Sequence, residues 1–133
     1  MKKTGILLAD LSRVVANLGH GPMIAIGDAG LSVPPSVPCI DFAIRAGFSG
    51  FWNLLDTVLS EMEVERAVVA AEASTEVIGH FAEWLDVESV SHEALKGMSA
   101  GAVAVVRTGE TVAYKNVVLV NGVVILIALH NWS

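Results

Sequence analysis

Residues 102–125 read AVAVVRTGETVAYKNVVLVNGVVI and give the strongest indication of the fold. The segment holds two apolar, largely β-branched runs, 102–106 and 117–125, with polar residues between them. Continuous apolar runs of this kind are typical of strands that are buried on both faces. Between them we predict a turn at 107–110, in which Gly109 supplies a positive φ as it would in an ordinary hairpin. The segment therefore predicts two buried strands.

The rest of the chain alternates between short apolar runs and stretches with apolar residues at helical spacing. Further strands are predicted over 23–26, 64–71 and 87–91, of which the last is short enough for an edge strand. Helices are predicted over 7–18, 51–59, 73–85 and 92–98. Segment 40–44 fits a strand or a helix equally well. Because strands and helices alternate, we predict a layered α/β fold in one domain, residues 1–133.

The composition is that of a small, apolar chain. Its 133 residues are enough for one compact domain and too few for two ordinary ones. Hydrophobic residues make up 53% and charged residues 17%, so we expect the apolar surplus to lie in subunit interfaces. The net charge is -6 and the basic residues are scattered. This charge pattern argues against a nucleic-acid partner.

Neither a leader nor a membrane span is expected. The basic and apolar start, 2–8, is ended by Asp10 before a secretory core is complete. The most apolar stretch, 117–129, is interrupted by Asn121 and Gly122 and is shorter than the roughly 20 residues of a spanning helix. Cys39 is the single cysteine, which excludes an internal disulfide. We therefore predict a cytoplasmic protein.

Three short motifs each fall short of a known signature, so that no metal or nucleotide cofactor is expected. Gly19-His20-Gly21 lacks the third glycine of a dinucleotide fingerprint and follows a helix. His92-Glu93 has no second histidine at the zinc-protease spacing. Gly47-Phe48-Ser49-Gly50 is one residue short of a nucleophile elbow.

What remains is a set of polar residues at the predicted ends of elements. They are His20, Asp28, His92, Lys96, Glu110, Tyr114 and Asn116. Each also has an ordinary interpretation, since most histidines and carboxylates are surface or capping groups. Lys96 alone would be a solvated helix residue, and Tyr114 an interface ring. If several element ends converge, these side chains share one cleft.

The order of these motifs resembles that of the D-ribose pyranases and of their relatives, the L-fucose mutarotases. The resemblance covers about residues 1–125. It is carried by Leu18-Gly19-His20, Asp28-Ala29-Gly30-Leu31, Ser91-His92-Glu93 with Lys96, Arg107-Thr108-Gly109-Glu110 and Tyr114-Lys115-Asn116. It implies the layered α/β fold of that group and an isomerase that interconverts the pyranose and furanose forms of D-ribose.

By this resemblance His20 looks like the catalytic proton donor, and Asp28, His92, Tyr114 and Asn116 look like substrate-binding residues. Lys96 is a further candidate. The chemistry agrees, because opening and reclosing a hemiacetal ring moves only protons, and imidazole with a pKa of about 6.5 exchanges protons near neutral pH. The resemblance also implies a homo-oligomer, a pentamer or a decamer, with sites near subunit boundaries, and a role in ribose catabolism after uptake.

Alternatives and departures remain. Gly30 resembles the ribose branch and Gly21 the fucose branch; we favour ribose. The alternatives are an L-fucose mutarotase, a non-catalytic sugar-binding accessory of a transport system, and an oligomeric scaffold whose polar ends are mere caps. Ala71 stands where the ribose branch often has the first of two glutamates, which leaves Glu72 alone, and Leu126–Ser133 extends beyond the usual end.

Overall fold

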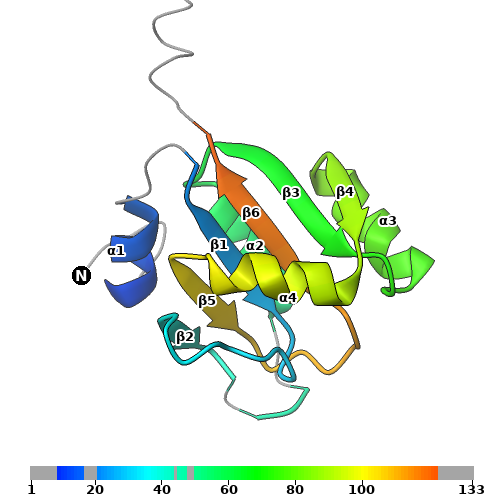
Figure 1. The fold of residues 1–133 in the computed structure, drawn as a ribbon, viewed down its shortest axis with the longest axis horizontal. Coiled ribbons are helices and arrows are strands. Elements are labelled where there is room, and N and C mark those ends of the chain that lie inside the picture. The colour runs from blue at the N-terminus through cyan, green and yellow to red at the C-terminus, as the bar shows by residue number, and fades with distance from the viewer. Residues whose placement is uncertain (1–8, 17–20, 44, 48–49, 123–133) are drawn as a thin grey trace, which may run out of the picture.

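The computed structural model describes residues 9–16, 21–43, 45–47 and 50–122 (Figure 1). Within them, six strands form one sheet in the order β2-β5-β1-β6-β3-β4. The strands are β1 (Met23–Gly27), β2 (Cys39–Asp41), β3 (Val64–Ala70), β4 (Val87–Val90), β5 (Ala104–Arg107) and β6 (Val117–Asn121). The ambiguous segment 40–44 therefore contributes an edge strand, and β4 is the opposite edge, as predicted.

The sheet consists of two parallel parts joined by one antiparallel strand. β1 and β5 are parallel, as are β2 and β5, and β3 and β4 form the second parallel pair. β6 runs antiparallel to both β1 and β3 and lies between them. All five residues of β6 are buried, as the apolar run at 117–125 predicts.

The prediction of a hairpin-like turn at 107–110 is wrong. β5 and β6 are not neighbours, because β1 lies between them. The positive φ is also elsewhere: among the described residues it occurs at Gly21, Gly47, Gly50 and, with φ 60°, at Tyr114, and not at Gly109. The connection from β5 to β6 crosses the end of β1 instead of folding back on β5.

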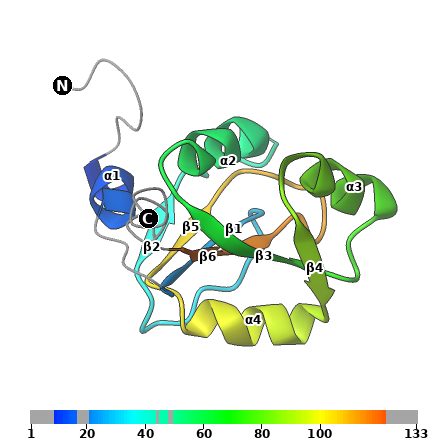
Figure 2. The same ribbon diagram turned by 90° about the horizontal axis from the view of Figure 1, so that it is seen from above.

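Helices cover both faces of the sheet (Figure 2). The described helices are α1 (Ala9–Ala16), α2 (Phe51–Leu59), α3 (Thr75–Trp84) and α4 (His92–Ala100). One face packs Leu11, Phe51, Leu55 and Phe81 against alternate strand residues such as Ile24. The other packs Leu95 of α4 against the residues between them, such as Ala25. This alternation confirms the α/β fold class.

Several of the predicted polar residues lie at one end of the sheet. β1 ends at Gly27 and delivers Asp28, whereas β6, running the other way, begins just after Asn116. β4 ends at Val90, which Ser91 and the first residue of α4, His92, follow. Carboxyl ends of parallel strands are a common place for ligand sites. No described helix is both long and apolar enough to cross a bilayer.

Candidate functional site

A cavity of about 420 Å³ opens at this end of the sheet. It is lined by Asp28, Ala29, Gly30, Leu31, His92, Glu110, Thr111, Ala113, Tyr114 and Asn116. Four of the predicted substrate-binding residues are thus brought together from the loop after β1, the start of α4 and the segment before β6. Lys96 does not line it. His20, the predicted proton donor, lies outside the described residues, as do Gly19 and Leu126–Ser133.

Two hydrogen bonds fix Asp28, one through its main chain and one through its carboxylate. Its main-chain N–H donates to Asn116 Oδ1 at 2.8 Å, and its own Oδ1 accepts the Gly30 N–H at 2.9 Å. Burial raises the pKa of the Asp28 carboxyl above its ordinary value, although Gly30, His92, Asn116 and Tyr114 each favour the charged form. Asp28 is therefore a carboxylate whose negative charge burial destabilises.

The backbone beneath Asp28 is fixed by buried residues. The Gly27 carbonyl accepts both the Thr108 N–H, at 3.0 Å, and the Thr108 hydroxyl, at 2.9 Å. Thr108 is wholly buried and Asn116 is 3% exposed. Gly27 itself has no room for a side chain, since a Cβ would lie 2.5 Å from Asn116 Oδ1. The absence of a side chain at Gly27 thus lets Asn116 reach Asp28.

His92 begins α4, where the helix end is capped from two sides. The Ser91 hydroxyl accepts the Ala94 N–H at 3.1 Å, and both carboxylate oxygens of Glu72 lie 2.9 Å from the His92 N–H. The His92 ring meets Tyr114 edge to face, with centroids 5.1 Å apart. Its Nδ1 is buried and has no hydrogen-bond partner among the described residues. A buried polar atom of this kind suits a ligand hydroxyl.

Tyr114 has a backbone conformation that is uncommon for tyrosine. Its φ is 60°, and its carbonyl accepts the Asn116 N–H at 2.9 Å. Left-handed backbone outside glycine and asparagine is costly and concentrates at functional sites. Tyr114 lines the cavity and the residue is 37% exposed, which places it at the cavity rim.

Glu110 and Lys115 form a buried ion pair that sequence reasoning missed. Lys115 Nζ lies 2.7 Å from Glu110 Oε1, with side-chain exposures of 10% and 13%. Burial acts to raise the pKa of Glu110, but Lys115 and the N–H groups of Val112 and Thr111 together hold that pKa below its ordinary value. The sequence signal that could have indicated this ion pair is a glutamate and a lysine five residues apart, one on either side of a loop.

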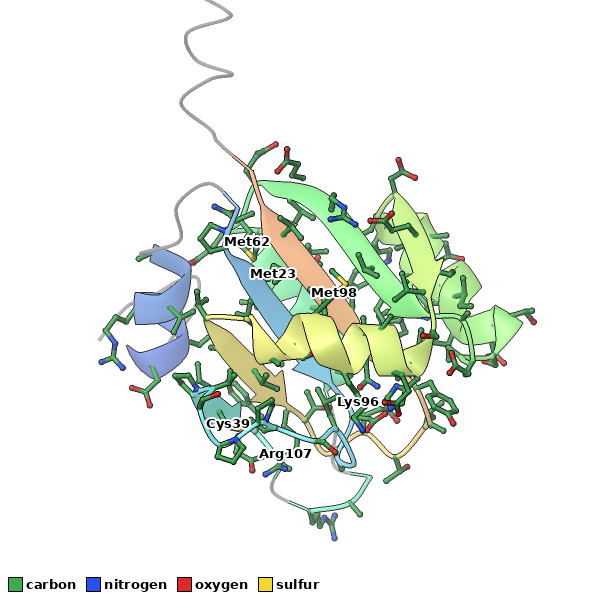
Figure 3. All side chains as sticks on the ribbon, in the orientation of Figure 1. Met23, Cys39, Met62, Lys96, Met98 and Arg107 are labelled. Carbon is green, nitrogen blue, oxygen red and sulfur yellow. The ribbon has the colours of Figure 1, made fainter. Side chains whose placement is uncertain are left out.

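Lys96 is a partly exposed residue of α4 that pairs with Glu93. Its Nζ lies 3.8 Å from Glu93 Oε1 one turn earlier, and its side chain is 40% exposed. In Figure 3 it extends from α4 into the lower part of the view, where Arg107 at the end of β5 also lies. Its predicted substrate contact stays a prediction.

The raised pKa of Asp28 predicts a stability gain on neutralisation. An unfolded aspartate has a pKa of about 3.9, so the folded chain takes up a proton at a higher pH than the unfolded chain. Stability contributed by Asp28 is therefore lost as pH rises through this interval. Asp28→Asn should melt at a higher temperature than the parent at pH 7, and the difference should shrink below pH 4. Melting curves from pH 3 to 7 test this; an unchanged difference at all pH values would contradict it.

The cavity offers a carboxylate, an imidazole, a phenol and an amide around one volume. Such a set donates to and accepts from several hydroxyl groups at once, which is what binding a polyhydroxylated small molecule requires. The apolar Leu31 and Ala113 are also part of the lining.

Comparison with known proteins shows the family of this chain. The chain matches the RbsD / FucU transport protein family over residues 1–124. A D-ribose pyranase from Paracidovorax citrulli is 48% identical over 128 residues, covering 92% of this chain and 98% of that protein. Bacillus subtilis RbsD complexed with D-ribose is 40% identical with a TM-score of 0.85, covering 93% and 99%. Streptococcus pneumoniae fucose mutarotase in complex with L-fucose, at 23% identity and TM-score 0.78 over 93% and 99%, shares the fold. The chain therefore belongs to the RbsD / FucU family.

Proposed function

We propose that this chain is a D-ribose pyranase, an isomerase that interconverts the pyranose and furanose forms of D-ribose. The observation that carries the proposal is the cavity at the end of β1, where Asp28, His92, Tyr114 and Asn116 meet. The 48% identity to a D-ribose pyranase and the 40% identity to RbsD complexed with D-ribose support ribose as the sugar. The fucose mutarotase, at 23% identity, supports the fold alone.

The reaction needs proton transfer and little else from the protein. One proton leaves the anomeric hydroxyl and another reaches the ring oxygen as the C–O bond opens; the aldehyde then recloses through a different hydroxyl. Asp28 and Asn116 fix the sugar through a rigid hydrogen-bonded pair. Buried Nδ1 of His92 takes a further hydroxyl. Tyr114, whose ring meets the His92 ring edge to face, forms the rim of the cavity beside His92.

His20 is the proposed proton donor, and the fold bears on where it acts. The Gly21 N–H donates to the Asn121 carbonyl at 2.9 Å, at the far end of β6 from Asn116. β1 separates Gly21 from Asp28, and at a rise of about 3.3 Å per residue its ends lie about 13 Å apart. Gly21, which follows His20 in the sequence, thus lies at the opposite end of β1 from the cavity.

We therefore propose that His20 of one copy serves the cavity of another. This accords with a homo-oligomer, a pentamer or a pair of pentamers, and with the exposure of Val112 and Tyr114 near the cavity at 44% and 37%. Symmetric rings place one face of each subunit against a different face of the next, which lets every site be shared. We place the protein in the cytoplasm, where the free thiol of Cys39 suits a reducing medium.

NMR saturation transfer on D-ribose tests the function. With a catalytic amount of protein, exchange between pyranose and furanose forms should become faster than in buffer, and anomer exchange of L-fucose should gain less. A preference for fucose would assign an L-fucose mutarotase instead. Binding without faster exchange would indicate a sugar-binding accessory, and no sugar-dependent rise in melting temperature would indicate a scaffold.

A further inference from the structure

The chain segment from Glu110 to Asn116 is a wall between two cavities. Glu110, Thr111, Ala113, Tyr114 and Asn116 line the larger one. Val112 and Lys115 line a second cavity of about 180 Å³ on the other side, with Trp52 and His80 among its other lining residues. The position of this wall therefore sets where Tyr114 and Asn116 stand relative to a sugar.

Lys115 joins the wall to the α2 helix. It is 8% exposed, and its ammonium lies 5.2 Å from the centroid of the Trp52 ring and 5.8 Å from that of Phe51. The Trp52 ring in turn stacks on His80 of α3 at 3.7 Å. A buried lysine is uncommon unless its charge is paired. The charge of Lys115 is paired with Glu110 within the same wall.

Glu110 also forms hydrogen bonds with the backbone of the wall and of the loop after β1. Its Oε2 accepts the N–H groups of Thr111 and Val112, at 3.0 and 3.1 Å, and its carbonyl accepts the Ala29 N–H at 2.8 Å. The wall is thus attached to the loop after β1 through Glu110 at one end and through Asn116 and Asp28 at the other. Between these two points lie Thr111 to Lys115, including the left-handed Tyr114.

We propose that Lys115 is a positioning residue for the ribose reaction: by neutralising Glu110 and packing on Trp52, it holds Tyr114 and Asn116 in the geometry that binds the sugar. The inference rests on the proposed function and deepens it. Lys115 touches no substrate in this account. Without the ammonium, the buried Glu110 carboxylate loses the cation 2.7 Å from its Oε1, and the wall is drawn toward solvent to hydrate the carboxylate.

The test is a comparison of ribose exchange kinetics between variants. Lys115→Met keeps the length and the apolar contacts of the lysine stem. In this variant KM for ribose should rise about tenfold, because the contacts of Tyr114 and Asn116 with the sugar are loosened. The value of kcat should stay within about threefold of the parent's, because proton transfer by His20 is unchanged. Adding Glu110→Gln removes the carboxylate charge that Lys115 neutralises, while an amide oxygen still accepts N–H groups. This double variant should recover KM to within about threefold of the parent. Arg66→Met, which breaks an exposed ion pair with Glu88, is the control and should change neither constant.

Each outcome of this comparison either supports or overturns the positioning role of Lys115. A Lys115→Met variant with the parent's KM, or with a lowered kcat at unchanged KM, overturns the inference. If Lys115→Met does not fold, the double variant decides: a near-parental KM supports the charge-neutralising role, and a KM that stays tenfold raised overturns it. A parent protein that fails to accelerate ribose exchange overturns the proposed function and this inference with it. An active parent with unaffected variants overturns this inference alone.

Discussion

His20→Ala is expected to slow the exchange between ribose ring forms by about 10²–10⁴-fold, the usual contribution of a positioned general acid–base group. The loss should fall on kcat, because Asp28, His92, Tyr114 and Asn116 remain to bind the sugar. Saturation transfer measures the rate, and chemical-shift titration with ribose measures the retained affinity. Undiminished exchange would remove His20 from the reaction.

A mixing experiment separates a shared site from a site within one chain. His20→Ala and Asp28→Asn are each expected to be strongly impaired, and after joint unfolding and refolding they should form hybrid oligomers. If each site takes His20 from one copy and Asp28 from another, random assembly of equal amounts restores about a quarter of the sites. Co-refolding should then recover activity that neither variant shows alone. No recovery in verified hybrids would place both residues in the same chain.

Gly27→Ala is expected to damage both stability and binding. The new methyl group would lie 2.3 Å from Leu31 Cδ2 and 2.5 Å from Asn116 Oδ1. Leu31 can rotate away, but Asn116 is held to the Asp28 N–H at 2.8 Å. Overpacking of this kind costs about 1–3 kcal/mol. Urea denaturation should show that loss, and ribose affinity should fall by about tenfold or more, since a small misplacement at a site is amplified.

Gly79→Ala is the matched control. Gly79 lies within α3, and an added Cβ there meets nothing within 4 Å. The same substitution should therefore stabilise the chain by about 0.5–1 kcal/mol through helix propensity and leave ribose binding unchanged. Equal effects of the two substitutions would contradict the account of Gly27.

The elements were predictable from the sequence where burial dominates local structure. The apolar runs that became β1, β3 and β6 lie in the sheet with their residues largely buried, and the helical spacing at Leu55 and Phe81 marks the faces of α2 and α3 that pack on it. Segment 40–44 could not be decided, because β2 is a three-residue edge strand with a single buried residue, Ile40.

The order of the strands was not predictable from local pattern. Two apolar runs separated by a glycine-containing turn favour a hairpin, yet β1 inserts between β5 and β6. The same crossing explains the misplaced positive φ: the chain turns at Tyr114, whose side chain gives no sequence signal for left-handed backbone, rather than at Gly109.

Four of the predicted site residues share a cavity, whereas the residues that support them were not predicted. Asp28, His92, Tyr114 and Asn116 do share one cavity. The Glu110–Lys115 pair and the Glu72 carboxylate on the His92 N–H depend on tertiary placement, and charged residues are expected at the surface by default. Lys96, which was predicted with them, does not line this cavity.

The antiparallel strand β6 also affects how the chain folds during translation. Translation delivers β1 to β5 first, as two separate parallel ribbons whose exposed edges have no common neighbour until residues 117–121 emerge from the ribosome. Closure of the sheet and creation of the sugar cavity, which depends on Asn116, are then one late event. A nascent chain stalled before β6 has nearly all of its helices and strands but presents open strand edges, which invite aggregation.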